Sequence, residues 1–154
     1  MESNVEVIEN LPVKTFSAGE TLIEEGGLPG VLYFLKTGAV EISKGGVSIA
    51  NVKEPGAVFG EMSVLLDSVH TATVRTLGDS AFYAVDEPME FLKEFPGIAA
   101  YVATILARRM DALNKYLVDM KSQFKDQNGD VWLVDEVLEA IMAKHFEPLN
   151  TLRK

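Results

Sequence analysis

The segment TFSAGETLIEEGGLPGVLYFLKTGAVEI, residues 15–42, decides the fold that the sequence predicts. Short runs of strand-forming residues, such as TLI, VLYFL and AVEI, alternate in it with glycines and polar residues. The same punctuation continues to residue 85, and Gly45-Gly46 between two such runs predicts a two-residue hairpin turn. Many short strands separated by turn signals are typical of antiparallel sandwiches and barrels. We therefore expect a mainly β domain, an antiparallel β-roll of the jelly-roll or double-stranded β-helix type, followed by C-terminal helices.

A helical period replaces this alternation after Pro88 and predicts a long helix from Ile98 to Phe124. Apolar residues recur along this helix at alternating intervals of four and three, which is a heptad pattern. They are Leu106, Met110, Leu113, Leu117, Met120 and Phe124. The pattern indicates packing along another helix, so we expect a homodimer; the alternative is that the stripe packs on the β-layer of its own chain.

The polar stretch KDQNGD at residues 125–130 predicts the end of this helix. An apolar stripe within residues 131–147 predicts a further amphipathic helix that ends near Pro148, where it could cap the dimer or dock on an effector protein. The predicted organisation is a β-roll over residues 1–90, helices with the dimerisation heptad over 91–125, and an extra helix with a tail over 126–154.

Charge and composition exclude several classes of function. With 23 acidic and 14 basic residues the net charge is −9, which would repel nucleic acid, so we expect no direct DNA binding. The chain has no cysteine, and no catalytic or metal-ligand motif surrounds its two histidines, so we expect neither a metal site nor an enzyme. The opening residues MESNVEVIEN carry no basic signal region, and no apolar run is long enough to span a bilayer. We expect a soluble, cytoplasmic protein without a cofactor or a membrane partner.

Two segments resemble the cyclic-nucleotide-binding domain that the catabolite activator protein, kinase regulatory subunits and gated channels share. They are residues 15–42 and PGAVFGEMSVLLDSVHTATVRT, residues 55–76. FPGIAAYVATILARRMDALNKYL, residues 95–117, is similar to the B- and C-helices of the activator-protein group, in which the C-helix pairs with its two-fold mate. The resemblance implies a β-roll with a phosphate-binding cassette at residues 59–74, and it supports the expected dimer.

The resemblance also implies roles for single residues of the cassette. Phe59 leads into it, and Gly60 would let the backbone approach the ligand. Glu61 would accept a hydrogen bond from a ribose 2′-hydroxyl. The backbone N–H groups of Met62 and Ser63 would face the cyclic phosphate from the start of a short helix. The implied ligand is cyclic AMP or cyclic GMP, and the sequence does not distinguish them.

The cassette departs from the family pattern at His70, where the family places an arginine that grips the phosphate. No other basic residue lies between Glu61 and Arg75, and Arg75 is about 13 Å beyond Thr71 along an extended strand, too far to substitute. A neutral histidine offers one donor instead of a charged fork, a difference of about 1.5–3 kcal/mol that a protonated ring would partly recover. By the same resemblance, the hydroxyl of Thr71 could contact the ligand and Asn114 on the long helix could meet a purine edge.

Two functions stay open on these residues. The first is a regulatory module that senses a cyclic nucleotide or another anionic effector. The resemblance implies that the ligand then orders the cassette, that Leu65 and Leu66 shift against a hinge at residues 91–95, and that the C-helix closes over the base. The second is a non-binding relative in which the roll survives as a scaffold for dimerisation or protein interaction.

Overall fold

The computed structural model describes residues 2–125, 136, 137, 139–141 and 143. The chain divides into two compact units, Met1–Ala103 and Thr104–Lys154. Almost all of the predicted turn at 125–130, most of the predicted helix at 131–147 and the tail after Pro148 lie outside the described residues.

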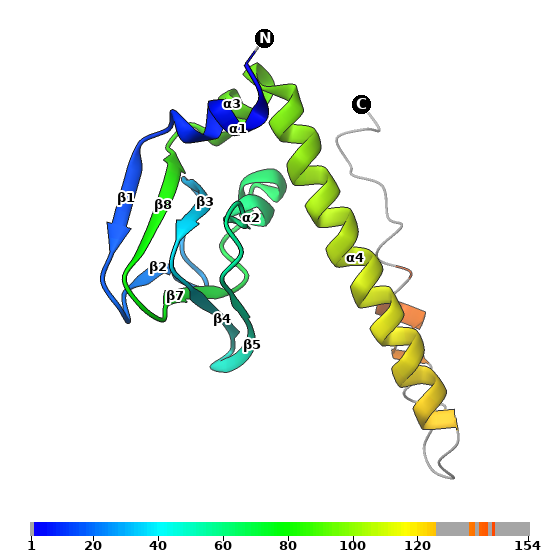
Figure 1. The fold of residues 1–154 in the computed structure, drawn as a ribbon. Helices are drawn as coiled ribbons and strands as arrows, with labels where there is room; N and C mark the ends of the chain where they lie inside the picture. The colour runs from blue at the N-terminus through cyan, green and yellow to red at the C-terminus, as the bar shows by residue number, and fades with distance from the viewer. Residues whose placement is uncertain (1, 126–135, 138, 142, 144–154) are drawn as a thin grey trace. The chain divides into compact units, whose positions relative to one another are not determined.

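The first unit contains two antiparallel sheets (Figure 1). The strands are β1 Val13–Phe16, β2 Thr21–Ile23, β3 Leu32–Thr37, β4 Val40–Lys44, β5 Val47–Val52, β6 Val58–Phe59, β7 Thr73–Thr76 and β8 Ser80–Val85. Over the described residues, one four-stranded sheet has the order β1-β8-β3-β6 and the other has the order β2-β7-β4-β5. Each strand overlaps one of the β-runs of the sequence, so the predicted roll is confirmed.

The hairpin between β4 and β5 turns at Gly45-Gly46, as predicted. Both glycines have positive φ, +56° and +78°. This is the conformation that a two-residue turn with the right strand twist requires, and side chains other than glycine adopt it at a cost.

Four helices have their bounds among the described residues: α1 Asn4–Glu9, α2 Glu61–Leu66, α3 Pro88–Glu94 and α4 Pro96–Lys125. The long helix is confirmed, with bounds close to those predicted. Helix α1 was not predicted, although Ser3 and Glu6 form a capping box in which each side chain accepts a hydrogen bond from the other residue's N–H. The bond from the Ser3 N–H holds the pKa of Glu6 below its usual value. In the described part of the chain, no helix has the length and hydropathy of a membrane-spanning segment.

Aromatic rings form the centre of the core of the roll. Phe82 is fully buried and meets Phe16, Tyr33 and Phe59 edge to face, with ring centroids 5.7, 6.0 and 6.1 Å apart. Such pairs contribute about 0.5–1.5 kcal/mol each beyond the area they bury. Since Phe59 is the last residue before Gly60, the core fixes the point at which the cassette leaves its sheet.

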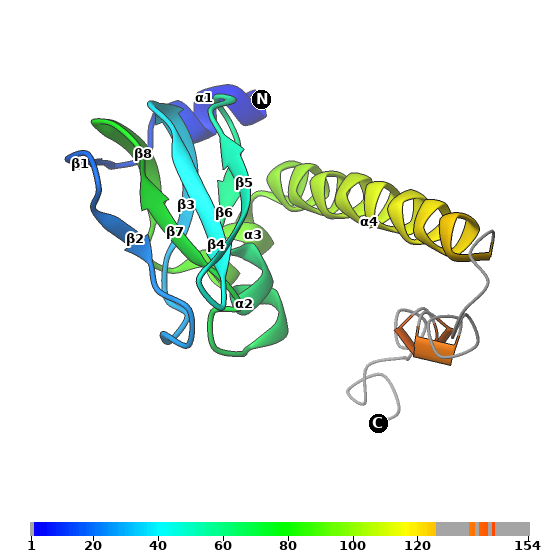
Figure 2. The same ribbon diagram turned by 90° about the horizontal axis from the view of Figure 1, so that it is seen from below.

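The first turns of α4 belong to the same unit as the roll. Ile98 and Val102 are buried, and the Tyr101 hydroxyl donates a hydrogen bond to the Gly56 carbonyl at 3.0 Å. Gly56 lies in the loop that leads into β6, so the start of α4 is tied to the segment just before the cassette. Figure 2 shows α4 starting beside the roll.

The second unit shows that the heptad stripe is not uniform. Leu117 is buried within the single chain at 8% exposure, whereas Met110 and Leu113 are 44% and 45% exposed. Leu106 and Met120 are half-buried. The side chain of Phe124 lies outside the description. The exposed part of the stripe is therefore at Met110 and Leu113.

The chain itself approaches α4 near Leu117. The Lys121 ammonium lies 3.7 Å from a carboxylate oxygen of Glu139, and the described residues between 136 and 143 are helical. The stripe of α4 is therefore partly buried within the single chain, at Leu117, and its pairing with a second copy stays a prediction.

Candidate ligand-binding cassette

Gly60 begins the cassette in a conformation that favours glycine. Its φ is +88°, and a Cβ added there would lie 2.6 Å from the Val31 carbonyl oxygen. The backbone of the cassette therefore passes directly against the segment that enters β3. This contact requires glycine whether or not the backbone also approaches a ligand.

Helix α2 follows at once and places two polar side chains inside. Glu61 and Ser63 are 4% and 2% exposed. The first intrahelical bond runs from the Val64 N–H to the Gly60 carbonyl at 3.2 Å, so the N–H groups of Met62 and Ser63 precede the helical ladder. The buried Glu61 carboxylate and the N–H groups of Met62 and Ser63 therefore lie on the same short helix.

His70 meets this helix at its third residue. Its Nδ1 lies 2.8 Å from the Ser63 Oγ, which is also 3.1 Å from the Gly60 carbonyl. The backbone of His70 is paired on both sides, since its N–H donates to Gly27 and its carbonyl accepts from Gly26, each at 2.8 Å. The structure thus brings His70, Ser63 and Gly60 together at one end of α2. The sequence did not predict the Ser63 contact.

The other polar residues near the cassette have different surroundings. Thr71 is exposed in the bend before β7 and is not part of the strand. Arg75 donates a hydrogen bond from Nε to the Gly19 carbonyl at 2.8 Å. Its guanidinium is therefore engaged at the turn that contains Gly19, outside the cassette. Asn114 belongs to the second unit, where the residue is half-buried and its buried Oδ1 has no hydrogen-bond partner among the described residues. Its contact with a purine stays a prediction.

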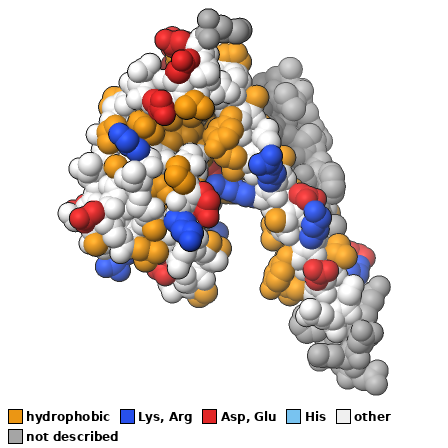
Figure 3. Space-filling view, viewed as in Figure 1, with side chains coloured by type: hydrophobic (Ala, Val, Ile, Leu, Met, Phe, Trp, Pro, Cys, Tyr) orange, Lys and Arg blue, Asp and Glu red, His pale blue; other side chains and the backbone are white. Residues whose placement is uncertain are grey.

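The outer side of the cassette is apolar. Met62, Leu65, Leu66 and Val69 are between 44% and 56% exposed. Figure 3 shows hydrophobic side chains gathered on this face of the roll over α2 and β3. These apolar side chains are therefore exposed in the single chain.

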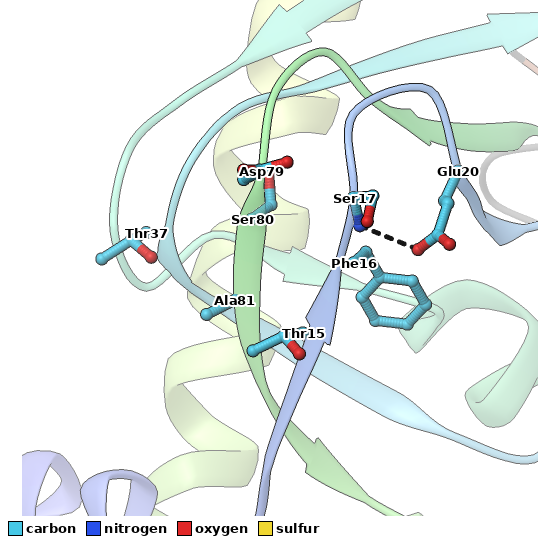
Figure 4. Close-up of a pocket in the computed structure, with 8 residues that line it drawn as sticks. All are labelled: Thr15, Phe16, Ser17, Glu20, Thr37, Asp79, Ser80 and Ala81. Carbon is cyan, nitrogen blue, oxygen red and sulfur yellow. Dashed lines mark hydrogen bonds between the residues drawn. The ribbon is translucent and has the colours of Figure 1, made fainter.

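A groove of about 480 Å³ lies elsewhere in the roll (Figure 4). It is lined by Thr15, Phe16, Ser17, Glu20, Thr37, Asp79, Ser80 and Ala81, none of them in the cassette. Its carboxylates cap turns: Glu20 accepts from the Ser17 N–H at 2.9 Å and Asp79 from the Ala18 N–H at 3.2 Å. Two carboxylates without a cation in the lining do not suit an anionic ligand. No group of three or more His, Asp or Glu side chains in the described residues could hold a metal ion.

The sequence model described as "Cyclic nucleotide-binding domain" matches residues 13–93, from β1 to α3. The chain belongs to the cyclic nucleotide-binding domain family. This confirms the predicted resemblance, and the whole cassette of residues 59–74 lies inside the matched range.

The curated relatives include kinase regulatory subunits and cyclic nucleotide-gated channels. The chain is 26% identical over 160 residues to the cAMP-dependent protein kinase regulatory subunit of Yarrowia lipolytica, covering 92% of this chain and 42% of that protein. It spans only 20% of a second such subunit, from Mucor circinelloides, and 13% of a hyperpolarization-activated cyclic nucleotide-gated channel from mouse. The chain therefore spans less than half the length of these curated relatives.

Solved structures share the fold. The cAMP-bound PfPKA-R fragment has a TM-score of 0.58 at 24% identity, covering 75% of this chain and 39% of that chain. The N-terminal domain of a transcriptional regulator from Streptomyces coelicolor A3(2) has a TM-score of 0.54 at 26% identity, covering 72% and 84%. Both agree with the β-roll and helices found here.

Proposed function

We propose that this chain is a regulatory module that binds a cyclic nucleotide in the cassette of residues 59–74, with an affinity limited by His70. The observation that carries the proposal is the contact between His70 and Ser63, which holds an imidazole near the start of α2. Ser63 is two residues after the buried Glu61 on the same helix. The sugar-phosphate part of a cyclic nucleotide carries a ribose hydroxyl and a phosphate, which need a carboxylate acceptor and an N–H donor respectively. In this proposal the ligand also repositions the C-terminal helices.

Each polar group then has one role. Glu61 accepts from the ribose 2′-hydroxyl, and the N–H groups of Met62 and Ser63 donate to the cyclic phosphate. His70 supplies the donor that replaces the family arginine, and Thr71 offers an exposed hydroxyl at the mouth of the site. Arg75 takes no part, because its side chain is bound at Gly19.

Calorimetric titration with cyclic AMP and cyclic GMP, at pH 6 and at pH 8, tests the proposal. Protonation gives the imidazole a positive charge and a second N–H, so we expect saturable binding that is tighter at pH 6. Amide hydrogen exchange of α3 in the same samples reports whether the helices respond. An affinity that is equal at both values would contradict the role of His70, even if binding occurs.

The second candidate is a scaffold that has kept the fold and lost the ligand. The absence of a guanidinium from the described cassette favours it, since His70 offers no permanent charge. Absence of heat with both nucleotides at both pH values, confirmed by an unchanged thermal midpoint, would select this function.

We also propose a homodimer through the exposed part of the α4 stripe. Leu113→Glu is expected to shift a micromolar sample from dimer to monomer, because it puts a charge into an apolar seam where Leu113 is 45% exposed in the single chain. Analytical ultracentrifugation measures the shift. Leu117→Glu is a poorer test, since Leu117 is buried within its own chain and its loss would damage the second unit directly.

Ser122→Glu is the matched control, because Ser122 is exposed on the same helix and lies off the stripe. It should leave the sedimentation coefficient unchanged. A wild-type monomer, or equal dissociation by both variants, would rule out this interface. The effector partner and the cytoplasmic location stay predictions.

A further inference from the structure

The Ser63 hydroxyl lies between a ring nitrogen of His70 and the Gly60 carbonyl inside the cassette. Its Oγ is 2.8 Å from the His70 Nδ1 and 3.1 Å from the Gly60 carbonyl oxygen, and Ser63 is only 2% exposed. A hydroxyl carries one hydrogen, so it donates to one of these partners at a time. The partner to which Ser63 donates is linked to which nitrogen of the His70 ring carries the hydrogen.

The geometry favours donation to His70 when the ring is neutral. The Gly60 carbonyl already accepts the Val64 N–H at 3.2 Å, so it does not depend on Ser63. The contact with Nδ1 is also the shorter of the two. The hydrogen bond made at one ring nitrogen sets which nitrogen carries the proton, so a neutral His70 that accepts at Nδ1 carries its hydrogen on Nε2.

The surroundings of the ring leave Nε2 as the nitrogen that can meet a ligand. The Nδ1 edge faces Ser63, and the Cδ2 atom lies over Gly27, where an added Cβ would be 3.5 Å from it. Backbone bonds to Gly26 and Gly27 fix the position from which the side chain starts. These contacts fix the direction of the Nε2–H donor. Direction is important here because the imidazole has no permanent charge.

Charged residues on the neighbouring elements are mainly acidic. Glu24 and Glu25 precede Gly26, and Glu61 and Asp67 stand at the two ends of α2. The Glu25 carboxylate accepts the Gly45 N–H at 2.9 Å. On β7, Arg75 is bound at Gly19. Because these neighbouring charges do not attract a phosphate, its binding depends more on the orientation of the His70 N–H donor than on the local charge.

We infer that Ser63 is a positioning residue for the phosphate contact: it holds His70 with the Nε2–H directed to an anion. When His70 is protonated, Nδ1–H donates to the Ser63 Oγ and the Ser63 hydrogen turns to the Gly60 carbonyl, so no heavy atom has to move. The ring then offers Nε2–H to the ligand in both protonation states. This inference rests on the proposed function as far as the ligand is concerned, and on the ligand-free geometry alone as far as the tautomer is concerned.

Nitrogen-15 NMR of the histidine rings in the ligand-free protein at pH 8 tests the tautomer. The His70 signals are assigned by their loss in His70→Ala. We expect the Nε2–H form with an Nδ1 that accepts a hydrogen bond, and the signature of that bond should disappear in Ser63→Ala and stay in Ser68→Ala. Ser68 is the matched control, since its hydroxyl donates to the Val69 carbonyl within the same cassette. An Nδ1–H form in the wild type would overturn the inference.

A double-mutant cycle tests whether Ser63 acts through His70. At pH 8, Ser63→Ala is expected to weaken cyclic AMP binding roughly two- to ten-fold, the range for the loss of one hydrogen bond. The same change in a His70→Ala background should have no effect. An unchanged affinity in Ser63→Ala, or an equal loss in the His70→Ala background, would mean that Ser63 does not act through the imidazole.

The two readouts separate the possible failures. If the wild type binds neither nucleotide, the proposed function fails and the NMR result alone decides the role of Ser63. If the wild type binds and the cycle shows no coupling, the proposed function stands and this inference fails.

Discussion

His70→Arg is expected to strengthen cyclic AMP binding at least ten-fold at pH 8. Arginine brings a permanent charge and a planar fork of N–H donors that matches a phosphate, and a charge-assisted bond of this kind contributes about 1.5–3 kcal/mol. The structure can accept the change. The Ser63 hydroxyl loses its partner at Nδ1 but has the Gly60 carbonyl at 3.1 Å, so no buried donor is left without an acceptor.

Val69→Arg is the control for charge alone. Val69 is 50% exposed and precedes His70, so an arginine there adds the same charge to the cassette from an outward position. Calorimetry at a single ionic strength should show a small gain for Val69→Arg and a large one for His70→Arg. Equal gains would mean that the net charge of the cassette limits binding, and no gain in either would mean that the pocket is closed for another reason.

Gly60→Ala is expected to destabilise the first unit strongly. A residue with a side chain at φ +88° costs about 1–3 kcal/mol, and the added Cβ would lie 2.6 Å from the Val31 carbonyl oxygen, an overpacking cost of about another 1–3 kcal/mol. Together these are a large part of the total stability of a typical domain, about 5–15 kcal/mol. Urea denaturation measures the change as a shift of the midpoint.

Gly46→Ala separates the two costs. Gly46 has a similar φ of +78°, and an added Cβ would have no atom within 4 Å. It should therefore show only the conformational cost, and the difference between the two variants measures the contact with Val31. Equal destabilisation by both substitutions would show that this contact is relieved by a small backbone shift.

The β-roll was predictable because its strands are short, apolar and separated by turn residues. Gly45 and Gly46 identify their hairpin without any tertiary information. Helix α1 was missed because it has only six residues and one buried side chain, Val7, so it shows almost no apolar period. Its signal is the capping pair of Ser3 and Glu6, two residues whose spacing marks a helix start.

The sequence gives only the outline of the candidate site. The resemblance picks out Gly60, Glu61 and His70, but the direction of a side chain is not encoded in a motif. The Ser63 hydroxyl meets His70 because α2 starts where the chain leaves β6 and because Gly26 and Gly27 hold the backbone of His70. These contacts depend on a loop more than forty residues earlier in the chain, as residue numbers show.

Periodicity was also insufficient to identify what covers α4. A heptad stripe has the same spacing whether a second copy or the same chain lies on it. Leu117 is buried in the single chain while Leu113 is exposed, a distinction that the heptad spacing does not contain. Only the three-dimensional structure separates the two parts of the stripe.

The pairing of β1 with β8 has a consequence for how the chain is made. Lys14 of β1 contacts Asp86, the residue after β8, at 3.2 Å, and the two are 72 positions apart, whereas β4 and β5 pair across two glycines. During synthesis the β4–β5 ribbon can close as soon as it emerges, but β1 has no partner strand until nearly the whole roll has left the ribosome. The nascent chain therefore holds β1 as an unpaired strand until β8 has emerged, and a pairing between segments so far apart in sequence forms more slowly than a local hairpin.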